Sequence, residues 1–266
     1  MYNIIDTHCH LDIVENKGLP VKNAVELAKQ SGVKSIIQIG VDLESSLRAR
    51  DISRDFTDEG INIHFTAGIH PTDIHEPSEI PQIRKIVEES LDSHLFTGIG
   101  EVGLDLYHDK STLPLQEKVL DEMLSLAQEH TLPVVIHSRD AAEETYSALK
   151  NFQDRVFGVI HCFTYNYEYA KKFVDLGYYV SFSGIVAFNN AKDIQDAASK
   201  LPLETILIET DAPFLSPPPN RGKRNDSSNM VHILEKMFAL RKEDKETVEE
   251  QLFTNSMKFI GRKPYA

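Results

Sequence analysis

Residues 4–10 read IIDTHCH, an apolar run that leads into two histidines separated by one cysteine. In an extended strand successive side chains point to opposite faces, so His8 and His10 share one face and Cys9 lies on the other. Two imidazoles side by side at a strand end can bind one divalent metal ion. A pair of ordinary hydrogen-bonded histidines is the alternative, and the rest of the chain decides between the two.

Further segments like the first recur along the whole chain. Each is short, rich in β-branched or aromatic residues and bounded by Gly, Pro or polar residues, which is typical of strands, and amphipathic stretches typical of helices lie between them. The eight predicted strands are residues 3–8, 34–40, 62–68, 95–101, 133–137, 156–161, 178–183 and 205–211. The predicted helices are residues 22–31, 43–56, 79–91, 117–130, 140–150, 166–176, 190–199, 228–240 and 245–259.

This alternation of strands and helices predicts a parallel sheet with crossover helices, a fold of the α/β class. Eight units of roughly 30 residues match a closed (β/α)₈ TIM-type barrel of the metal-dependent hydrolase type. We therefore expect residues 1–266 to form a single domain of this kind, because barrels commonly use a chain of about this length. An open doubly wound sheet is the alternative.

The composition is that of an ordinary globular protein, with 41% hydrophobic and 26% charged residues, so there is enough apolar material for one large core. No segment approaches the ~18 uninterrupted apolar residues of a membrane span, and the first residues do not resemble a signal peptide. We expect a cytoplasmic protein with no membrane partner and no obligatory protein partner. Two cysteines, Cys9 and Cys162, do not make a disulfide framework.

The net charge of −13 argues against broad, sequence-independent attraction to nucleic acid. It does not exclude a nucleic-acid substrate, because bound metal ions and a few arginines can make a local site positive. Solubility is the simpler role of such an acidic surface.

Four more metal-binding side chains fall at the ends of later predicted strands. Glu101 closes the fourth strand, His137 the fifth, His161 the sixth and Asp211 the eighth. In a barrel of this type the functional groups come from the carboxyl ends of several strands, so these side chains would converge on one mouth together with His8 and His10. The sequence therefore predicts a shared metal site.

These ligands suit a centre of two divalent ions. His8, His10 and Asp211 can hold one ion, His137 and His161 a second, and Glu101 can bridge them. Nitrogen and oxygen ligands without thiolate favour Zn²⁺ or Mn²⁺, with Mg²⁺ where carboxylates and water dominate. Two such ions would activate a water molecule, which Asp211 would orient or deprotonate; the catalytic residues are then Asp211 and Glu101. A plain ligand role is the alternative for Asp211.

Residues suited to bind substrate surround this predicted centre. His70 follows the third strand and Arg139 follows His137 by two residues, so both are candidates for phosphate contacts. The loop PPPNRGKRND, residues 217–226, follows the eighth strand and suits an anionic substrate, although basic loops are often merely solvated. Its cations are Arg221, Lys223 and Arg224. Asp105, in the loop that follows Glu101, is suited to bond a ligand histidine.

On these motifs the chain resembles the TatD family of metal-dependent deoxyribonucleases, within the amidohydrolase-like barrels. The matching stretches are IDTHCHLD (5–12), GIHP (68–71), GEVGLD (100–105), LPVVIHSRDA (132–141), GVIHCF (158–163), IETDAP (208–213) and RGKRN (221–225). The resemblance implies a (β/α)₈ barrel, a divalent-metal centre and hydrolysis of DNA, typically from the 3′ end of single strands. It assigns the metal-ligand roles to His8, His10, Glu101, His137, His161 and Asp211.

The chain departs from the family pattern in two places. The family usually has an aromatic residue and an Arg after its GLD, where residues 106–108 read Leu-Tyr-His. The family commonly continues after RGKRN with an acid and a Pro, whereas Asp226 is followed by Ser227-Ser228. We therefore expect no contact from the usual Arg and a different entry to the next helix, with the metal ligands unaffected.

Two other functions fit the same residues. A small-molecule hydrolase acting on an ester, amide or lactone would share the fold and the metal ligands, because one fold supports many chemistries. A metal-containing binding protein without turnover is the second. The basic loop separates a polyanion substrate from a neutral one, and a turnover assay separates an enzyme from a binding protein.

Overall fold

Every predicted strand is present in the computed structural model, which describes residues 2–56, 60–74 and 79–265. The strands lie within a few residues of their expected places. They are β1 Ile4–Cys9, β2 Val33–Gln38, β3 Asn62–Ala67, β4 Phe96–Asp105, β5 Val134–Arg139, β6 Gly158–Ile160, β7 Tyr178–Phe182 and β8 Ile206–Ile208.

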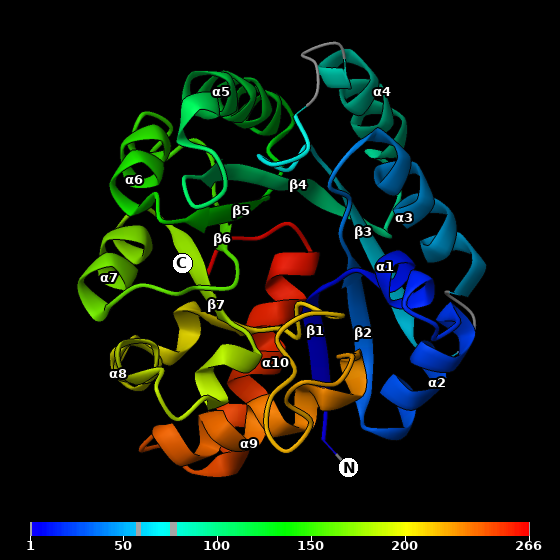
Figure 1. Ribbon diagram of the computed structural model, residues 1–266, viewed down its shortest axis with the longest axis vertical. Coiled ribbons are helices and arrows are strands. Elements are labelled where there is room, and N and C mark those ends of the chain that lie inside the picture. Colours follow the sequence, from blue (N-terminus) through cyan, green and yellow to red (C-terminus); the bar gives the residue numbers. More distant parts are fainter. Residues whose placement is uncertain (1, 57–59, 75–78, 266) are drawn as a thin grey trace.

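The strands form one parallel eight-stranded sheet in the order β1 to β8, with helices arranged around it (Figure 1). The chain that follows β8 returns to β1, where the Asp211 amide donates to the His8 carbonyl (3.0 Å) and the His10 amide donates to the Ala212 carbonyl (2.8 Å). These bonds nearly close the sheet into a barrel, as predicted. The alternative of an open doubly wound sheet is wrong, because its strand order would not follow the sequence.

The predicted helices are also present, and the helix α1, Leu11–Asn16, is one that the sequence pattern did not predict. The others are α2 Val21–Gln30, α3 Leu43–Phe56, α4 Ile80–Ser90, α5 Leu113–His130, α6 Ala142–Lys150, α7 Tyr167–Asp175, α8 Lys192–Lys200, α9 Met230–Leu240 and α10 Lys245–Ile260. Among the described helices, none combines the length and the apolar character that crossing a bilayer requires.

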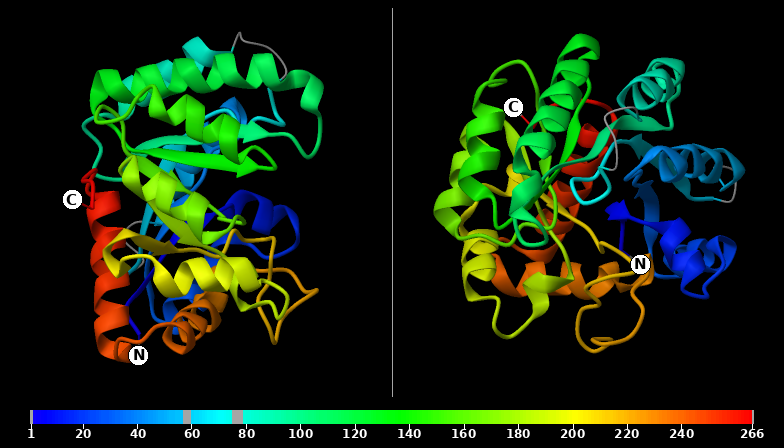
Figure 2. Two further views of the ribbon diagram at one scale, coloured as in Figure 1. Left: turned by 90° about the vertical axis from the view of Figure 1, so that its left-hand side faces the viewer. Right: turned by 45° about the horizontal axis from the view of Figure 1, so that its top comes forward.

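The core has two parts. The larger part fills the space between the strands and the surrounding helices. The smaller part lies inside the barrel, where inward-facing residues such as Ile37, Val135 and Leu207 pack on Phe259 and Ile260 of α10. Helix α10, red in Figure 2, covers one end of the barrel, and the orange loop after β8 lies at the other end. We call these ends the floor and the mouth.

Several predicted strand ends are wrong in detail. Strand β5 does not close at His137 but continues to Arg139. Strand β4 does not stop at Glu101 but continues to Asp105, and its last four residues pair with β5. Gly103 permits this close pairing, because a Cβ atom there would clash with the His137 carbonyl oxygen, and its φ of +152° is accessible to glycine. Asp105 is thus the last residue of a strand and not part of a loop. Strand β8 ends at Ile208, so Asp211 lies three residues beyond it.

Candidate metal centre

The first group of metal-binding atoms lies where β1 meets the chain after β8. The Nε2 atoms of His8 and His10 are 3.2 Å apart, and Oδ1 of Asp211 lies 3.8 and 3.6 Å from them. Glu101 contributes its Oε2 atom, 3.2 Å from His8 Nε2 and 3.9 Å from His10 Nε2. Four side chains from three segments therefore direct donor atoms at one point.

The second group lies on the other oxygen of Glu101. Its Oε1 atom is 2.8 Å from His161 Nε2, 2.9 Å from His137 Nδ1 and 3.3 Å from His70 Nε2. The nearest nitrogens of His137 and His161 are 3.5 Å apart. Because its two oxygens face different groups, Glu101 has the geometry of a bridge between two cation sites.

These spacings fit divalent metal ions. Donor atoms at about 2.0–2.1 Å from a tetrahedral ion lie about 3.3–3.4 Å from one another. The His8 Nε2 atom lies 3.2 Å both from His10 Nε2 and from Glu101 Oε2, which is close to that spacing. The Nδ1 atoms of His8 and His10 are buried, and in the described part of the chain they have no hydrogen-bond partner. Among the described residues, the groups able to hold a metal contain histidines and carboxylates but no cysteine. These groups could hold a metal ion through nitrogen and oxygen atoms, the donor chemistry that the sequence predicts.

The two cysteines point elsewhere. Cys9 is buried with its thiol 3.6 Å from the hydroxyl of Ser227, and the thiol of Cys162 is 3.3 Å from the hydroxyl of Ser183. Burial raises the pKa of both thiols well above the usual value, so both stay protonated. A protonated thiol is a poor metal ligand.

A second row of carboxylates orients the histidines. His137 turns Nδ1 to Glu101 and places Nε2 3.1 Å from Asp105 Oδ2, the contact that the sequence predicts. Asp105 also accepts hydrogen bonds from the amides of Tyr107 and His108. This arrangement presents the Nδ1 lone pair of His137 to the site, because a carboxylate that accepts the other N–H of a ligand histidine fixes its tautomer.

Glu209 has the same relation to His161, and the sequence analysis missed it. Its Oε1 atom lies 3.3 Å from His161 Nδ1 and accepts the Cys162 amide hydrogen at 2.6 Å. The side chain is buried, and its Oε2 atom has no hydrogen-bond partner among the described residues. The available signal was an acid directly after the apolar run of β8, two residues before Asp211.

The other acids near the first strand are structural. Asp6 accepts hydrogen bonds from the amide and hydroxyl of Thr210 and from the hydroxyl of Ser227. Burial raises the pKa of Asp6 to about 6 in spite of these bonds. Ser227, where the chain departs from the family pattern, thus donates a hydrogen bond that joins the loop after β8 to β1. The chain enters α9 through a 3₁₀ turn, Ser227–Asn229.

The electrostatics of the centre keep its carboxylates ionised. Burial alone would raise the pKa of Glu101, but His161, His70 and His8 together hold it well below the usual value. For His70 the influences have the opposite sign. Burial alone would lower its pKa, but Glu101 and Asp73 raise the pKa to about 9. An ionised carboxylate buried among imidazoles suits a site that binds cations.

The residues predicted to bind substrate are found in two places. His70 lies inside the second group of donors, beside Glu101, rather than outside it. The four cations lie on the exposed rim, each at or after the end of β5 or β8. The guanidinium of Arg139 covers the ring of Tyr107 (3.9 Å to the centroid), and that of Arg221 covers Phe188 (4.0 Å). The other two are Lys223, which is exposed, and Arg224, which donates to the Lys17 carbonyl oxygen at 3.1 Å.

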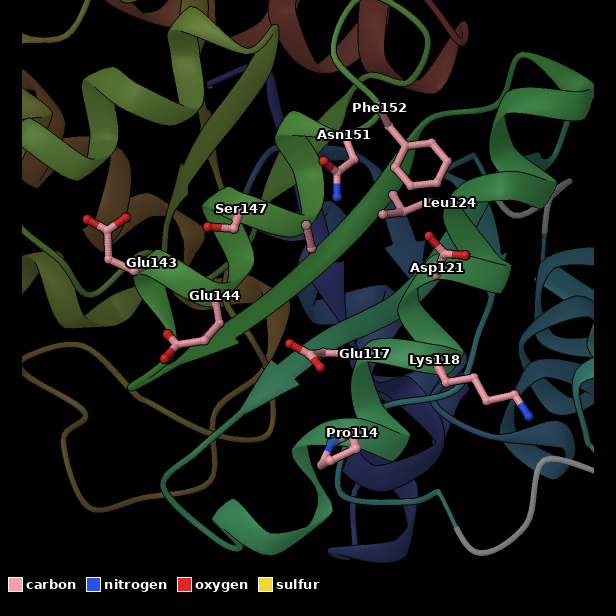
Figure 3. A pocket seen from close by; sticks show the side chains of 11 residues that line it. Pro114, Glu117, Lys118, Asp121, Leu124, Glu143, Glu144, Ser147, Asn151 and Phe152 are labelled. Atoms are coloured by element: carbon pink, nitrogen blue, oxygen red, sulfur yellow. The ribbon is translucent and has the colours of Figure 1, made fainter.

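A groove of about 750 Å³ lies between α5 and α6, on the outside of the barrel and away from this centre (Figure 3). Its charged lining consists of Lys118 and four acids, Glu117, Asp121, Glu143 and Glu144. No histidine lines it, and it contains none of the donors described above.

Known proteins resemble this chain over most of its length. Residues 5–261 match the family model described as TatD related DNase. The uncharacterized metal-dependent hydrolase YcfH of Escherichia coli (strain K12) is 35% identical over 243 residues, which cover 90% of this chain and 88% of the relative. The uncharacterized metal-dependent hydrolase YabD of Bacillus subtilis (strain 168) is 35% identical over 239 residues, 90% of this chain and 91% of the relative. The crystal structure of YjjV, a TatD homolog from Escherichia coli K12, superposes with a TM-score of 0.86 at 28% identity and covers 97% of both chains.

Proposed function

Because the chain belongs to the TatD family of metal-dependent hydrolases, we propose that it is a deoxyribonuclease that hydrolyses phosphodiester bonds in DNA from the 3′ end of single strands. The observation that carries this proposal is the position of Glu101, whose two oxygens face two separate groups of donors. Paired cation sites of this kind suit the in-line displacement of an oxygen at phosphorus.

In this proposal the metal ligands are His8, His10, Glu101, His137, His161 and Asp211, with His70 beside the second group. Two divalent ions, when bound, would supply activation of water near neutral pH and neutralisation of charge on the phosphate. The donor set is compatible with Zn²⁺, Mn²⁺ or Mg²⁺.

The chain's own residues then position and move protons. Asp211 has its Oδ1 atom at the first group and is the candidate to orient the attacking water and accept its proton, because its pKa is lowered and the side chain is ionised. Burial is the largest influence and opposes this lowering of the pKa, but the hydrogen bond from His10 and the charges of His8 and His161 together outweigh it. The rim cations Arg139, Arg221, Lys223 and Arg224 would contact the phosphates of a strand that enters the mouth.

The direct test is digestion of 3′-labelled and 5′-labelled single-stranded DNA, with and without added divalent metal. We expect the label to be released first from the 3′ end, and we expect His137→Ala and Glu101→Ala to reduce the rate by roughly 10²–10³-fold or more, the usual effect of removing a stabiliser of transition-state charge. Glu204→Ala, an exposed acid before β8, is the matched control. Equal cutting by all variants would contradict the proposal, and internal cutting would contradict the exonuclease polarity.

A second experiment separates a polyanion substrate from a small neutral ester. Replacing Arg221, Lys223 and Arg224 with Gln should weaken action on DNA, and each lost phosphate contact should reduce the slope of log affinity against log salt by about 0.7. The same triple variant should hydrolyse a neutral ester or lactone as the unmodified protein does. If the triple variant loses neither rate nor salt dependence on DNA, a small-molecule hydrolase is the better description.

A further inference from the structure

Two aromatic rings stand out from the rest of the described chain by their exposure. Tyr107 is 60% exposed and Phe214 is 42% exposed, while every other Tyr and Phe in the described ranges is buried or half-buried. Both lie at the mouth, Tyr107 two residues after β4 and Phe214 after β8. Large exposed rings concentrated beside a candidate catalytic site indicate a binding surface rather than chance.

Each ring is attached to a different group of metal-binding atoms. The Tyr107 amide donates to Asp105 Oδ1 at 2.9 Å, and the other oxygen of Asp105 lies against His137. The Phe214 amide donates to the Asp211 carbonyl oxygen at 2.9 Å, and the Phe214 ring meets His10 edge to face with centroids 6.3 Å apart. Tyr107 therefore stands beside the second group of donors and Phe214 beside the first.

The two rings flank the centre from opposite sides. In a ring of eight strands in sequential order, β4 and β8 are four positions apart and so lie across the barrel from each other. A substrate whose reacting bond lies at the centre would thus reach a ring on either side of that bond. A small neutral ester has no need of two such surfaces, whereas a nucleotide strand carries a planar base on each side of every phosphate.

A cationic side chain lies over each ring. The Arg139 guanidinium lies 3.9 Å from the centroid of Tyr107, and Lys17 Nζ lies 4.4 Å from the centroid of Phe214. Exposed aromatic rings accompanied by Lys or Arg are the elements with which proteins bind single-stranded nucleic acid, because the ring stacks on a base while the cation meets the backbone. The same pairing recurs on both sides of the centre.

We propose that Tyr107 with Arg139, and Phe214 with Lys17, form two base-stacking subsites that hold the nucleobases on either side of the phosphodiester to be cut. This inference rests on the proposed deoxyribonuclease function and deepens it. Base pairing would bury the planar faces that these rings bind, so the subsites favour unpaired strands.

The test compares two strands that differ only in their bases. One probe is a fluorescein-labelled decathymidylate with phosphorothioate linkages, and the other has the same backbone with a tetrahydrofuran in place of each nucleoside. Fluorescence anisotropy with the metal-loaded protein gives Kd for both. We expect the protein to prefer the strand with bases, and we expect Tyr107→Leu and Phe214→Leu each to weaken that binding by roughly 5- to 150-fold, the range for loss of one stacking contact. The affinity for the strand without bases should not change.

Conservative variants and a distant control keep the test specific. Tyr107→Phe and Phe214→Tyr retain a ring and should restore binding, and Met257→Ala removes an exposed apolar side chain from α10 and should have no effect. Equal affinity of the unmodified protein for both probes would overturn the inference. So would Leu variants that fold, as judged by their melting temperature, and retain the preference for bases.

A hydrolysis assay distinguishes failure of this inference from failure of the proposed function. If the unmodified protein digests DNA and the two Leu variants digest it with unchanged KM, the deoxyribonuclease proposal survives and the stacking subsites do not. If the protein prefers strands with bases but digests no DNA with any divalent metal, the subsites survive and the proposed function fails. A raised KM with little change in kcat in both Leu variants supports both.

Discussion

At the mouth of the barrel the interior is lined by histidines and carboxylates, whereas toward the floor the same strands contribute aliphatic and aromatic side chains to a small apolar core. At the mouth, carboxylate oxygens of Glu101 and Asp211 lie 3.2 and 3.8 Å from His8 Nε2. The floor packs Ile37 and Leu207, with other residues of the smaller core, against α10. One set of strands therefore builds two environments of opposite polarity.

This difference indicates that the floor contributes mainly to stability and the mouth mainly to binding. Nδ1 of His8 and Oε2 of Glu209 are buried without a hydrogen-bond partner among the described residues, and such atoms cost free energy that burial of apolar surface must offset. The floor and the outer core supply that surface, so the mouth can be arranged for binding cations. Substitutions at the floor should then change stability without changing metal binding, and substitutions at the mouth should do the reverse.

The largest effect should come from the floor. Phe259 of α10 is fully buried and meets the ring of Tyr179 with centroids 5.9 Å apart. Phe259→Ala should lower the free energy of unfolding by about 3–5 kcal/mol, because it removes a large side chain and leaves a cavity. Denaturant unfolding measures this, with exposed Met257→Ala on the same helix as a control expected to stay within about 0.5 kcal/mol. A comparable loss in both variants would mean that α10 does not close the floor as described.

Much of this contrast is visible in the sequence, because it follows from local patterns. The short apolar runs place all the strands, and the polar residues at their ends place His137 and His161 at one edge. Parallel strands in sequential order put their carboxyl ends together, so the convergence needs no knowledge of tertiary packing.

Other parts depend on contacts that no local pattern reveals. Strand β4 continues to Asp105 because glycines let it approach β5 closely, and a glycine in sequence reads equally well as a break. In the sequence Glu209 is one acid within the last predicted strand, and only the fold brings it against His161. His70 reaches Glu101 from a loop, and the pairing of Arg139 with Tyr107 joins two strand ends that are 32 positions apart in the chain.

A smaller effect should follow from removing ions at the mouth. Dialysis against a chelator should lower the free energy of unfolding by about 2.7 kcal/mol for each ion that had been present at 100 times its Kd. In Glu101→Gln the loss should be smaller, because this variant lacks the carboxylate that both groups share. Calorimetry with and without chelator checks both statements. An identical loss in the two proteins would argue against Glu101 as a shared ligand.

Replacing a carboxylate that orients one of the histidines should have a still smaller effect, and only on metal affinity. Glu209→Gln keeps the shape of the side chain but removes the charge that faces His161 Nδ1, and such changes typically weaken metal binding roughly 10- to 100-fold. Competition with a chelating dye measures the affinity, and Glu204→Gln, an exposed position earlier in the same segment, is the matched control. If Glu209→Gln binds metal as tightly as the control, this carboxylate only supports the Cys162 amide.

The smallest effect should be that of the thiol nearest the mouth. Cys162 follows His161 directly, so a sequence alone leaves it a suspect for metal binding, yet its sulfur faces the hydroxyl of Ser183 and burial raises its pKa well above the usual value. Cys162→Ser should therefore change neither the number of bound ions, measured by atomic absorption, nor their affinity. Because zinc binds thiolate strongly, the loss of even one ion in this variant would show that sulfur joins the nitrogen and oxygen donors at the mouth.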